Sequence, residues 1–202
     1  MWKCTNCHHV ELGPDRPERC PVCGAEADKL IPHEVLRIKG IKTLRNLKAG
    51  FIAESQAHLR NLAFAMKAEQ ENYSQVARLF RAIAEAEAVH AFNHIRLLGA
   101  VSSTQENLES AFERENLASS VYPHFIREAN EEDNTHVATI FSYSRDVEKG
   151  HAKLYKKALE HMIAESETEY YVCQVCGYVS DGILSDECPI CGAPKEKFRK
   201  VV

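Results

Sequence analysis

A pattern of carboxylate and imidazole side chains occurs twice in the chain, and each member of the second copy lies 61 residues after its counterpart. Each copy has one glutamate, followed 33 residues later by a Glu-x-x-His motif. Four carboxylates and two imidazoles, carried by four helices, form the ligand set of a two-metal site inside a helical bundle. The six residues are Glu54, Glu87 and His90 in the first copy and Glu115, Glu148 and His151 in the second.

The composition around these motifs indicates that helices position them. The middle of the chain is nearly free of Gly and Pro and rich in residues that favour helices. Apolar residues recur there at spacings of three and four, as expected for amphipathic helices. The predicted helices cover about 42–69, 73–98, 105–129 and 134–163.

Two local signals refine the third predicted helix. The Ser102-Ser103-Thr104 cluster predicts an N-cap at its start. Pro123 lies inside the helical pattern and predicts a kink or break, because proline lacks the backbone N–H that a helix needs.

The six repeated Glu and His residues fall on the apolar stripes of their helices, which should face the core. Neighbouring apolar residues repeat in the same register, so that Val76 and Phe80 recur as Val137 and Phe141. A buried carboxylate must be paired, protonated or bound to a metal. Two divalent cations would cancel the charge of four carboxylates. The alternative is a duplicated helical hairpin whose repeated polar residues form a hydrogen-bond network.

The eight cysteines form a second class of candidate ligands. All occur as C-x-x-C pairs near the two ends, and the residues between Cys23 and Cys173 include no cysteine. This placement favours two metal sites of four thiolates, holding zinc or a single iron, over a disulfide framework. The N-terminal set is Cys4, Cys7, Cys20 and Cys23, and the C-terminal set is Cys173, Cys176, Cys188 and Cys191.

Length, charge and hydropathy exclude several classes of protein. A chain of 202 residues with 45% hydrophobic residues suits one medium domain with small appendages. Its net charge of −4 gives no basic surface for nucleic acid, so no nucleic-acid partner is expected. No long uncharged apolar run predicts a membrane span, and the N-terminus lacks a signal-peptide pattern. We therefore expect a cytoplasmic protein without a membrane partner.

Taken together, these motifs resemble the rubrerythrin family over nearly the whole chain. The segment Asn46–Ser55 looks like that family's first ligand helix, and the two Glu-x-x-His motifs look like its second and fourth. The segment from Asn107 to Pro123 looks like the third ligand helix, and Cys173–Phe198 looks like the rubredoxin domain.

The resemblance implies a mainly α fold, a ferritin-like four-helix bundle flanked by two rubredoxin-like or zinc-ribbon-like Cys4 domains. The expected boundaries are 1–35, 36–166 and 167–202. It further implies a carboxylate-bridged di-iron centre, with Glu87 and Glu148 as the bridging ligands. The expected activity is reduction of hydrogen peroxide to water, with electrons relayed by rubredoxin-type iron in defence against oxidative stress.

Two departures from the family pattern keep other functions open. Ala118 stands where the family usually has a second carboxylate on the third helix. The resulting symmetric ligand set is closer to ferritins, so a ferroxidase or oxygen-reducing protein is the alternative. The N-terminal knuckle has Cys7-His8-His9 where Cys-Gly-Tyr is usual, so its metal is iron or zinc. A zinc-loaded, non-enzymatic scaffold is a third hypothesis.

The remaining expectations concern partners and accessory residues. Hydrogen peroxide or oxygen is the expected substrate, and a reductase or rubredoxin is the expected electron donor. A homodimer or higher homo-oligomer is expected, because a head-to-tail partner, with or without exchanged helices, could bring its rubredoxin domain to the site. Tyr122 is a candidate hydrogen-bond donor to the site or a core residue. Glu113 could replace Glu115, and His58 is an unfavoured extra ligand. His94 and His161 are expected to be surface or capping residues.

Overall fold

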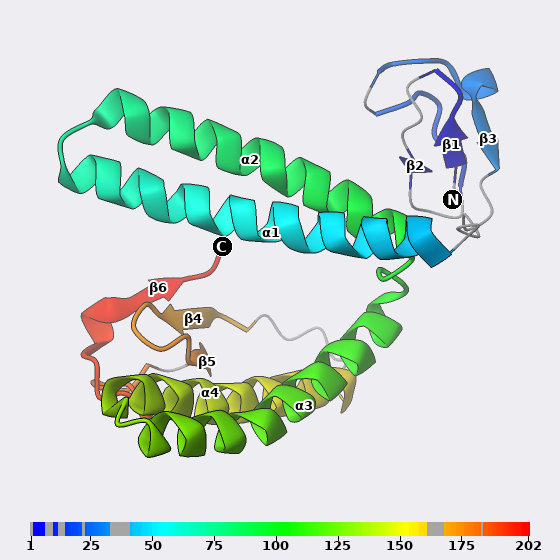
Figure 1. Ribbon diagram of the computed structural model, residues 1–202. Coiled ribbons are helices and arrows are strands. Elements are labelled where there is room, and N and C mark those ends of the chain that lie inside the picture. Colours follow the sequence, from blue (N-terminus) through cyan, green and yellow to red (C-terminus); the bar gives the residue numbers. More distant parts are fainter. Residues whose placement is uncertain are drawn as a thin grey trace. The chain divides into compact units, whose positions relative to one another are not determined.

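The computed structural model describes residues 2–6, 10–11, 15–21, 23–32, 41–160, 168–182 and 184–202. The chain divides into two compact units, Met1–Val101 and Ser102–Val202. Each unit contains one small three-stranded sheet and one pair of antiparallel helices (Figure 1). The three domain boundaries expected from the sequence stay a prediction.

Four helices make up most of the described chain, and their positions confirm those predicted from the apolar spacing. The helix α1 (Ile41–Gln70) packs along α2 (Ser74–Leu97) in the first unit. The helix α3 (Thr104–Glu131) packs along α4 (Thr135–Glu160) in the second. Part of the fourth predicted helix, from 161 to 163, lies outside the described residues.

Equivalent tight turns close the two hairpins. Asn72 and Asp133, which lie 61 residues apart, are the two described non-glycine residues with positive φ, at 65° and 60°. Asn and Asp tolerate this left-handed conformation better than most residues. The next residue then bonds back to the helix: the amide of Tyr73 donates to the carbonyl of Ala68, and Asn134 donates to Ala129. The repeat thus extends from the ligand motifs to the turns.

The start of α3 agrees with the predicted cap. The hydroxyl of Ser103 accepts a hydrogen bond from the amide of Glu106, and the Glu106 carboxylate accepts one from the amide of Ser103. These reciprocal bonds satisfy backbone donors that the first helical turn leaves unpaired. Hydrogen bonding to Ser103 lowers the pKa of Glu106, which keeps this carboxylate charged.

The break predicted as one possibility at Pro123 does not occur, since α3 continues through this residue. Tyr122 and Phe125 flank the proline, and both rings contact Phe141 of α4, with centroid distances of 6.0 and 5.7 Å. These contacts hold the helix on both sides of the proline. Packing across the hairpin therefore outweighs the loss of one backbone hydrogen bond.

Small residues dominate the interface within each hairpin. Ala68, Ala77 and Ala91 are buried in the first unit, and their counterparts at 129, 138 and 152 are buried alanines in the second. Short side chains allow two helices to approach closely. Many large apolar side chains are consequently left exposed on the hairpin surfaces, among them Phe64 and Leu79.

A small antiparallel sheet accompanies each hairpin. In the first, β1 (Trp2–Cys4) lies between β2 (Val10–Glu11) and β3 (Leu30–Pro32), with a 3-10 turn, Ala27–Lys29, before β3. In the second, β4 (Tyr170–Cys173) lies between β5 (Val179–Asp181) and β6 (Phe198–Lys200), with the turn Lys195–Lys197 before β6. The matching order shows that the two terminal domains share one topology.

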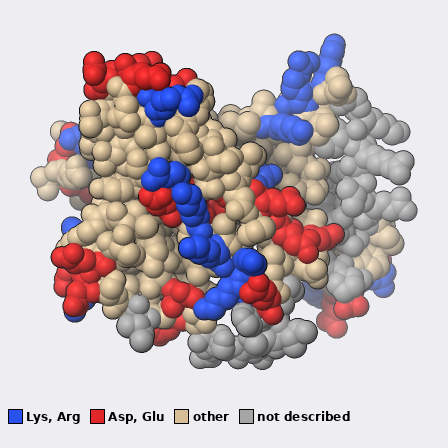
Figure 2. Space-filling view, turned by 90° about the horizontal axis from the view of Figure 1, so that it is seen from below, with Lys and Arg blue, Asp and Glu red and all other residues tan. Residues whose placement is uncertain are grey.

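The described helices include none with the length and apolar character needed to cross a bilayer. Figure 2 shows acidic and basic side chains interspersed on one face of the molecule.

Candidate metal centres

The first hairpin brings together three of the predicted ligands. Glu54 comes from α1, and Glu87 and His90 come from α2, one turn apart. Their nearest ligand atoms all lie within 4.8 Å of one another. The Nδ1 atom of His90 is 3.1 Å from Oε2 of Glu87. Two carboxylates and one imidazole therefore converge, with Nδ1 as the nitrogen that faces the carboxylate.

The second hairpin repeats this arrangement with Glu115 from α3 and Glu148 and His151 from α4. The Nδ1 atom of His151 lies 3.4 Å from a carboxylate oxygen of Glu148 and 3.9 Å from one of Glu115. All three side chains are partly buried, in keeping with their place on the apolar stripes. Each hairpin thus carries half of the predicted six-residue ligand set, and the role of these residues as ligands stays a prediction.

The carboxylates of the second half-site are electrostatically strained in the absence of a cation. Burial, together with the hydrogen bond and the negative charge of Glu148, raises the pKa of Glu115 to about 7. Two neighbouring carboxylates cannot easily both be ionised, so Glu115 holds a proton more readily than an isolated glutamate does. A bound divalent cation would replace that proton, so this donor set fits a metal of the type that prefers carboxylate and imidazole ligands.

The C-terminal domain contacts the second half-site directly. The carbonyl oxygen of Gly177 lies 3.2 Å from Nε2 of His151. A hydrogen bond donated by Nε2–H leaves the Nδ1 lone pair facing the carboxylates, which is the tautomer a metal ligand needs. A second contact joins Lys157 of α4 to Asp181 of β5. The side chain of His151 is 24% exposed, whereas that of His90, its counterpart, is 56% exposed.

The four C-terminal cysteines form one cluster. The Sγ atoms of Cys173 and Cys191 are 3.8 Å apart, and those of Cys176 and Cys188 are 3.6 Å apart. A tetrahedral site with metal–sulfur bonds of about 2.3 Å separates its sulfurs by about 3.8 Å. A disulfide would require about 2.05 Å. The geometry therefore fits a single tetrahedral metal ion.

The thiols of this cluster differ in acidity. Burial raises the pKa of Cys176 and Cys191. For Cys173, burial acts in the same direction, but hydrogen bonds from the backbone of Cys176 and Val175 lower its pKa overall. A metal ion would deprotonate all four thiols and reverse the effect of burial, because the cation stabilises thiolates.

The N-terminal domain has the same kind of cluster, made of Cys4, Cys20 and Cys23 in the described part of the chain. The Sγ atoms of Cys4 and Cys23 are 3.7 Å apart, which again fits a tetrahedral thiolate site. Cys7, the fourth predicted ligand, lies outside the described residues. The side-chain amide of Asn6 donates a hydrogen bond of 3.5 Å to the sulfur of Cys23.

The other candidate residues occupy distinct positions. Glu113 is exposed, whereas Glu115 joins the half-site, so the hairpin brings the latter residue to Glu148. The Nδ1 atom of His58 bonds to the carbonyl of Ala84 at 2.8 Å, which gives it a structural partner. Tyr122 packs against two phenylalanines, as described above, and its predicted hydrogen bond to the site stays a prediction.

His94 lies in the last turn of α2 and is partly buried. Its Nδ1 atom is buried and finds no hydrogen-bond partner among the described residues. The ring packs against Gly50 of α1, where an added Cβ would lie 2.9 Å from Cε1 of His94. The sequence spacing could have indicated this contact, because Gly50 lies one turn before Glu54 and His94 lies one turn after His90. A helical glycine opposite a histidine indicates close packing.

Comparison with protein families gives matches to the helical part of the chain and to both of its cysteine-rich ends. The model described as rubrerythrin matches residues 45–107 and 106–181. The model described as the rubredoxin-like domain of rubrerythrin matches residues 2–30 and 171–199. The first match covers more than half of the chain and contains all six residues of the two half-sites. The second falls on both Cys4 domains.

Individual relatives agree with this result. The chain is 32% identical to nigerythrin of Nitratidesulfovibrio vulgaris over 178 residues, covering 77% of this chain and 85% of the relative. It is 32% identical to rubrerythrin-2 of Clostridium acetobutylicum over 182 residues, covering 81% of this chain and 99% of the relative. A solved structure of nigerythrin in a partially reduced state has a TM-score of 0.49 and 34% identity, covering 78% of this chain and 86% of that one.

The two family matches and the cysteine clusters confirm the fold class, a ferritin-like helical protein with a rubredoxin-like domain at each end. They also support an iron-binding oxidoreductase, in agreement with the Glu/His and cysteine clusters. By the extent of the family match and the ligand pattern that it contains, this chain is a member of the rubrerythrin family.

Proposed function

We propose that this protein reduces hydrogen peroxide to water at a di-iron centre and receives electrons through rubredoxin-type iron. Glu54, Glu87 and His90 would hold one side of the centre. Glu115, Glu148 and His151 would hold the other. The reaction consumes two electrons and two protons for each peroxide and yields two water molecules. Bound ferrous iron would supply the two electrons, and the protein sets the ligand geometry and access to the site.

The hydrogen bond between His151 and Gly177 carries this proposal. Gly177 directly follows Cys176, a predicted thiolate ligand, and its carbonyl accepts from the ring whose other nitrogen faces Glu148. The chain therefore links the thiolate cluster to the half-site through a few covalent bonds and one hydrogen bond. Such a contact suits the transfer of single electrons into the bundle and has no evident use in a zinc scaffold.

The side chains also define how protons are handled at this site. The raised pKa of Glu115 favours its protonated form, so metal binding at this carboxylate would release a proton. The hydrogen bond to Gly177 holds the His151 ring with Nδ1 toward the carboxylates. These residues thus orient the metal ligands.

A second candidate function is the oxidation of ferrous iron by oxygen. It is favoured by Ala118, which lies on α3 one turn after Glu115, where the family usually has a further carboxylate. Without that carboxylate, the predicted ligand set is symmetric between the two hairpins and resembles that of ferritins.

Rapid mixing of the fully reduced protein with peroxide or with oxygen distinguishes the two functions. We expect peroxide to reoxidise the thiolate-bound iron faster than oxygen does, when its visible absorption is followed. Glu148→Ala should abolish turnover and leave that absorption intact, because the substitution is distant from the cysteines in sequence and removes a residue that would hold the di-iron centre. Metal analysis of the purified protein accompanies the measurement.

Each other result selects a different function. Oxygen that outpaces peroxide by a wide margin would support the ferroxidase or oxygen-reducing function. Zinc as the only bound metal would support the scaffold. Loss of both turnover and absorption in Glu148→Ala would indicate a folding defect, and Glu148→Gln, which preserves side-chain volume, then takes its place.

A further inference from the structure

The two Cys4 domains share one backbone frame around their sulfurs. In each, the first cysteine of the second C-x-x-C pair donates its amide to the carbonyl of an alanine five residues later, at 2.7 Å in both domains. The glycine after this pair has a positive φ, 72° at Gly24 and 70° at Gly192. The first and last sulfurs are 3.7 Å apart for Cys4 and Cys23 and 3.8 Å apart in the C-terminal domain. The two sites can therefore be compared position by position.

One side chain differs where the two frames agree. Asn6 lies inside the first C-x-x-C pair, and its Nδ2 atom donates a hydrogen bond of 3.5 Å to Sγ of Cys23. Once a metal is bound, this sulfur is a thiolate and can only accept. The counterpart of Asn6 is Val175, the second residue after Cys173, whose side chain has no N–H to donate. The N-terminal site therefore has a side-chain donor that the valine cannot supply to the C-terminal site.

Solvent reaches the last cysteine of each site to a different extent. Cys23 is exposed, whereas its counterpart, Cys191, is intermediate between exposed and buried. Water can solvate the sulfur of Cys23 and stabilise negative charge on it, as the amide of Asn6 does. Both features therefore act on the same ligand sulfur of the N-terminal site.

The backbone is held alike at this cysteine in the two domains. In the C-terminal site, the amide of Ala193 donates to the sulfur of Cys191. Ala25 is the counterpart of Ala193, and the carbonyls of both alanines accept the 2.7 Å bond described above. The side chain at positions 6 and 175 and the exposure of the last cysteine are the differences that remain.

These differences favour the reduction of an iron ion at the N-terminal site. Reduction of ferric to ferrous iron adds one negative charge to a centre that already carries four thiolates. Hydrogen bonds to the sulfurs and contact with water stabilise the more negative state, so both raise the reduction potential. Because Asn6 and the exposure of Cys23 act in the same direction, their effects reinforce each other.

We propose that Asn6 makes the N-terminal Cys4 site the one of higher reduction potential among the two thiolate-bound irons of this chain. The first electron from the reductase or rubredoxin then resides on the N-terminal iron, which changes from ferric to ferrous. The C-terminal iron, whose domain contacts His151, is reduced second and gives up its electron more readily. Asn6 acts through the sulfur of Cys23 and is not itself a ligand.

This inference gives the second Cys4 domain a function. It rests on iron, as proposed, at both Cys4 sites, and it does not depend on which oxidant the bundle reduces. Each thiolate-bound iron holds one electron, so one chain stores the two electrons that a peroxide molecule consumes. The difference in potential sets the order in which these electrons are taken up and released.

A redox titration of the full-length protein tests this order. The protein is loaded with ferrous iron without oxygen, its iron and zinc are counted, and the absorption of thiolate-bound ferric iron is followed against the applied potential. We expect two one-electron waves. The electron should prefer the higher-potential site about tenfold, which separates the waves by about 59 mV. In Asn6→Val the higher wave should move down toward the lower one, because the hydrogen bond to Cys23 is lost.

Two further variants serve as controls. Val175→Asn places a donor at the equivalent position of the C-terminal domain, so it should raise the lower wave and leave the higher wave in place. Thr5→Val alters the same turn as Asn6, but the Thr5 hydroxyl donates to the carbonyl of Lys29 and not to a sulfur. Thr5→Val should therefore leave both waves unchanged, which separates the effect of the hydrogen bond from a general disturbance of the domain.

Three results would overturn the proposal. They are an unchanged higher wave in Asn6→Val, equal shifts in Asn6→Val and Thr5→Val, and wild-type protein that keeps zinc at its N-terminal site and shows a single wave. Asn6→Ala replaces Asn6→Val if the latter loses iron. If both lose it, Val175→Asn decides, and an unchanged lower wave then rejects the proposal.

Peroxide turnover measured on the same wild-type sample separates this inference from the proposed function. Turnover without two separate waves rejects the role of Asn6 and leaves the peroxidase function in place. Two separate waves that respond to Asn6→Val, without turnover, reject the peroxidase function and leave the role of Asn6 in place.

Discussion

The two nitrogens of His151 have separate partners. Nδ1 faces the carboxylates of Glu115 and Glu148, while Nε2 is directed to the carbonyl of Gly177. A histidine that donates one N–H to a carbonyl is held in the tautomer that can bind a metal through the other nitrogen. His90 also presents Nδ1 to a carboxylate, but its side chain is more exposed. The two half-sites therefore share ligand types and differ in how firmly their imidazoles are held.

Two glutamates that lie two residues apart on α3, Glu113 and Glu115, allow a test at the level of single residues. We expect Glu115→Ala to remove most of the bundle iron, because Glu115 lies within ligand distance of Glu148 and His151. Glu113→Ala should retain wild-type iron, because Glu113 is exposed on the same helix. Iron bound by the reduced protein, corrected for the thiolate-bound fraction, is the measurement. Equal losses in the two variants would contradict the assignment of Glu115.

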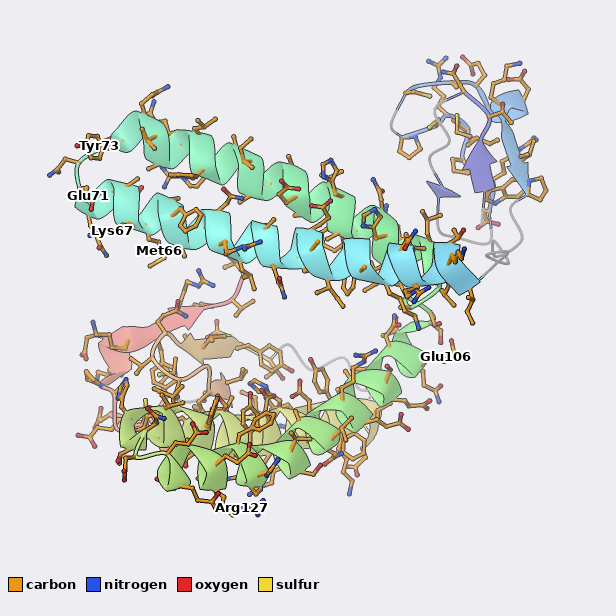
Figure 3. All side chains as sticks on the ribbon, viewed as in Figure 1. Met66, Lys67, Glu71, Tyr73, Glu106 and Arg127 are labelled. Carbon is orange, nitrogen blue, oxygen red and sulfur yellow. The ribbon has the colours of Figure 1, made fainter. Side chains whose placement is uncertain are left out.

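At the scale of elements, hydrogen bonds and packing decide how α3 is held. Its start is fixed by the reciprocal bonds of Ser103 and Glu106. Figure 3 labels Glu106 in the first turn of α3. Its middle is held by aromatic contacts on both sides of Pro123. Glu115 lies between these two regions, so the cap and the aromatic contacts together fix the position of a predicted metal ligand.

Removal of the cap should destabilise α3 measurably. Ser103→Ala is expected to lower the free energy of unfolding by about 1 kcal/mol, because the amide of Glu106 loses its acceptor. The matched control is Ser102→Ala, since Ser102 bonds to Asn107 through backbone atoms. Thermal unfolding followed by circular dichroism of the iron-loaded protein gives the comparison. Equal effects of the two substitutions would show that the capping bond contributes little.

At the scale of the whole molecule, the terminal domains and the helices are stabilised by different means. Among the described residues, the buried core of the N-terminal sheet consists of Cys4, Cys20 and Leu30, and Cys4 and Cys20 are predicted metal ligands. A domain this small rarely folds on apolar burial alone. The hairpins instead close on buried alanines along helices of 24 to 30 residues, which does not require a metal.

Removal of the thiolate-bound metal should therefore affect the ends before the helices. Trp2 is the one tryptophan in the sequence, and it packs against the N-terminal core. A strong chelator added under reducing conditions should shift the Trp2 fluorescence to longer wavelength, because the unfolded strand exposes the indole to water. Helical circular dichroism should persist under the same conditions. Simultaneous loss of both signals would contradict the separate stabilisation of helices and ends.

The sequence predicted the helices, the C-x-x-C clusters and the two Glu/His sets because their signals are local. The three-and-four spacing of apolar residues determines a helix and the face that carries Glu54, Glu87 or His90. Local spacing could not predict whether the helix breaks at Pro123, because this depends on aromatic contacts with a different helix. The contact between His94 and Gly50 could not be predicted for the same reason, because Gly50 belongs to the other helix of the hairpin.

By itself, the sequence determined which side chains are available for metal binding and the family to which the chain belongs. Both follow from residue types at fixed spacings along helices and knuckles. The tertiary structure decided which nitrogen of His151 faces the carboxylates and that the C-terminal domain contacts this ring through Gly177. No local sequence pattern relates residue 151 to residue 177. They come together only because β5 and the turn before it pack against α4.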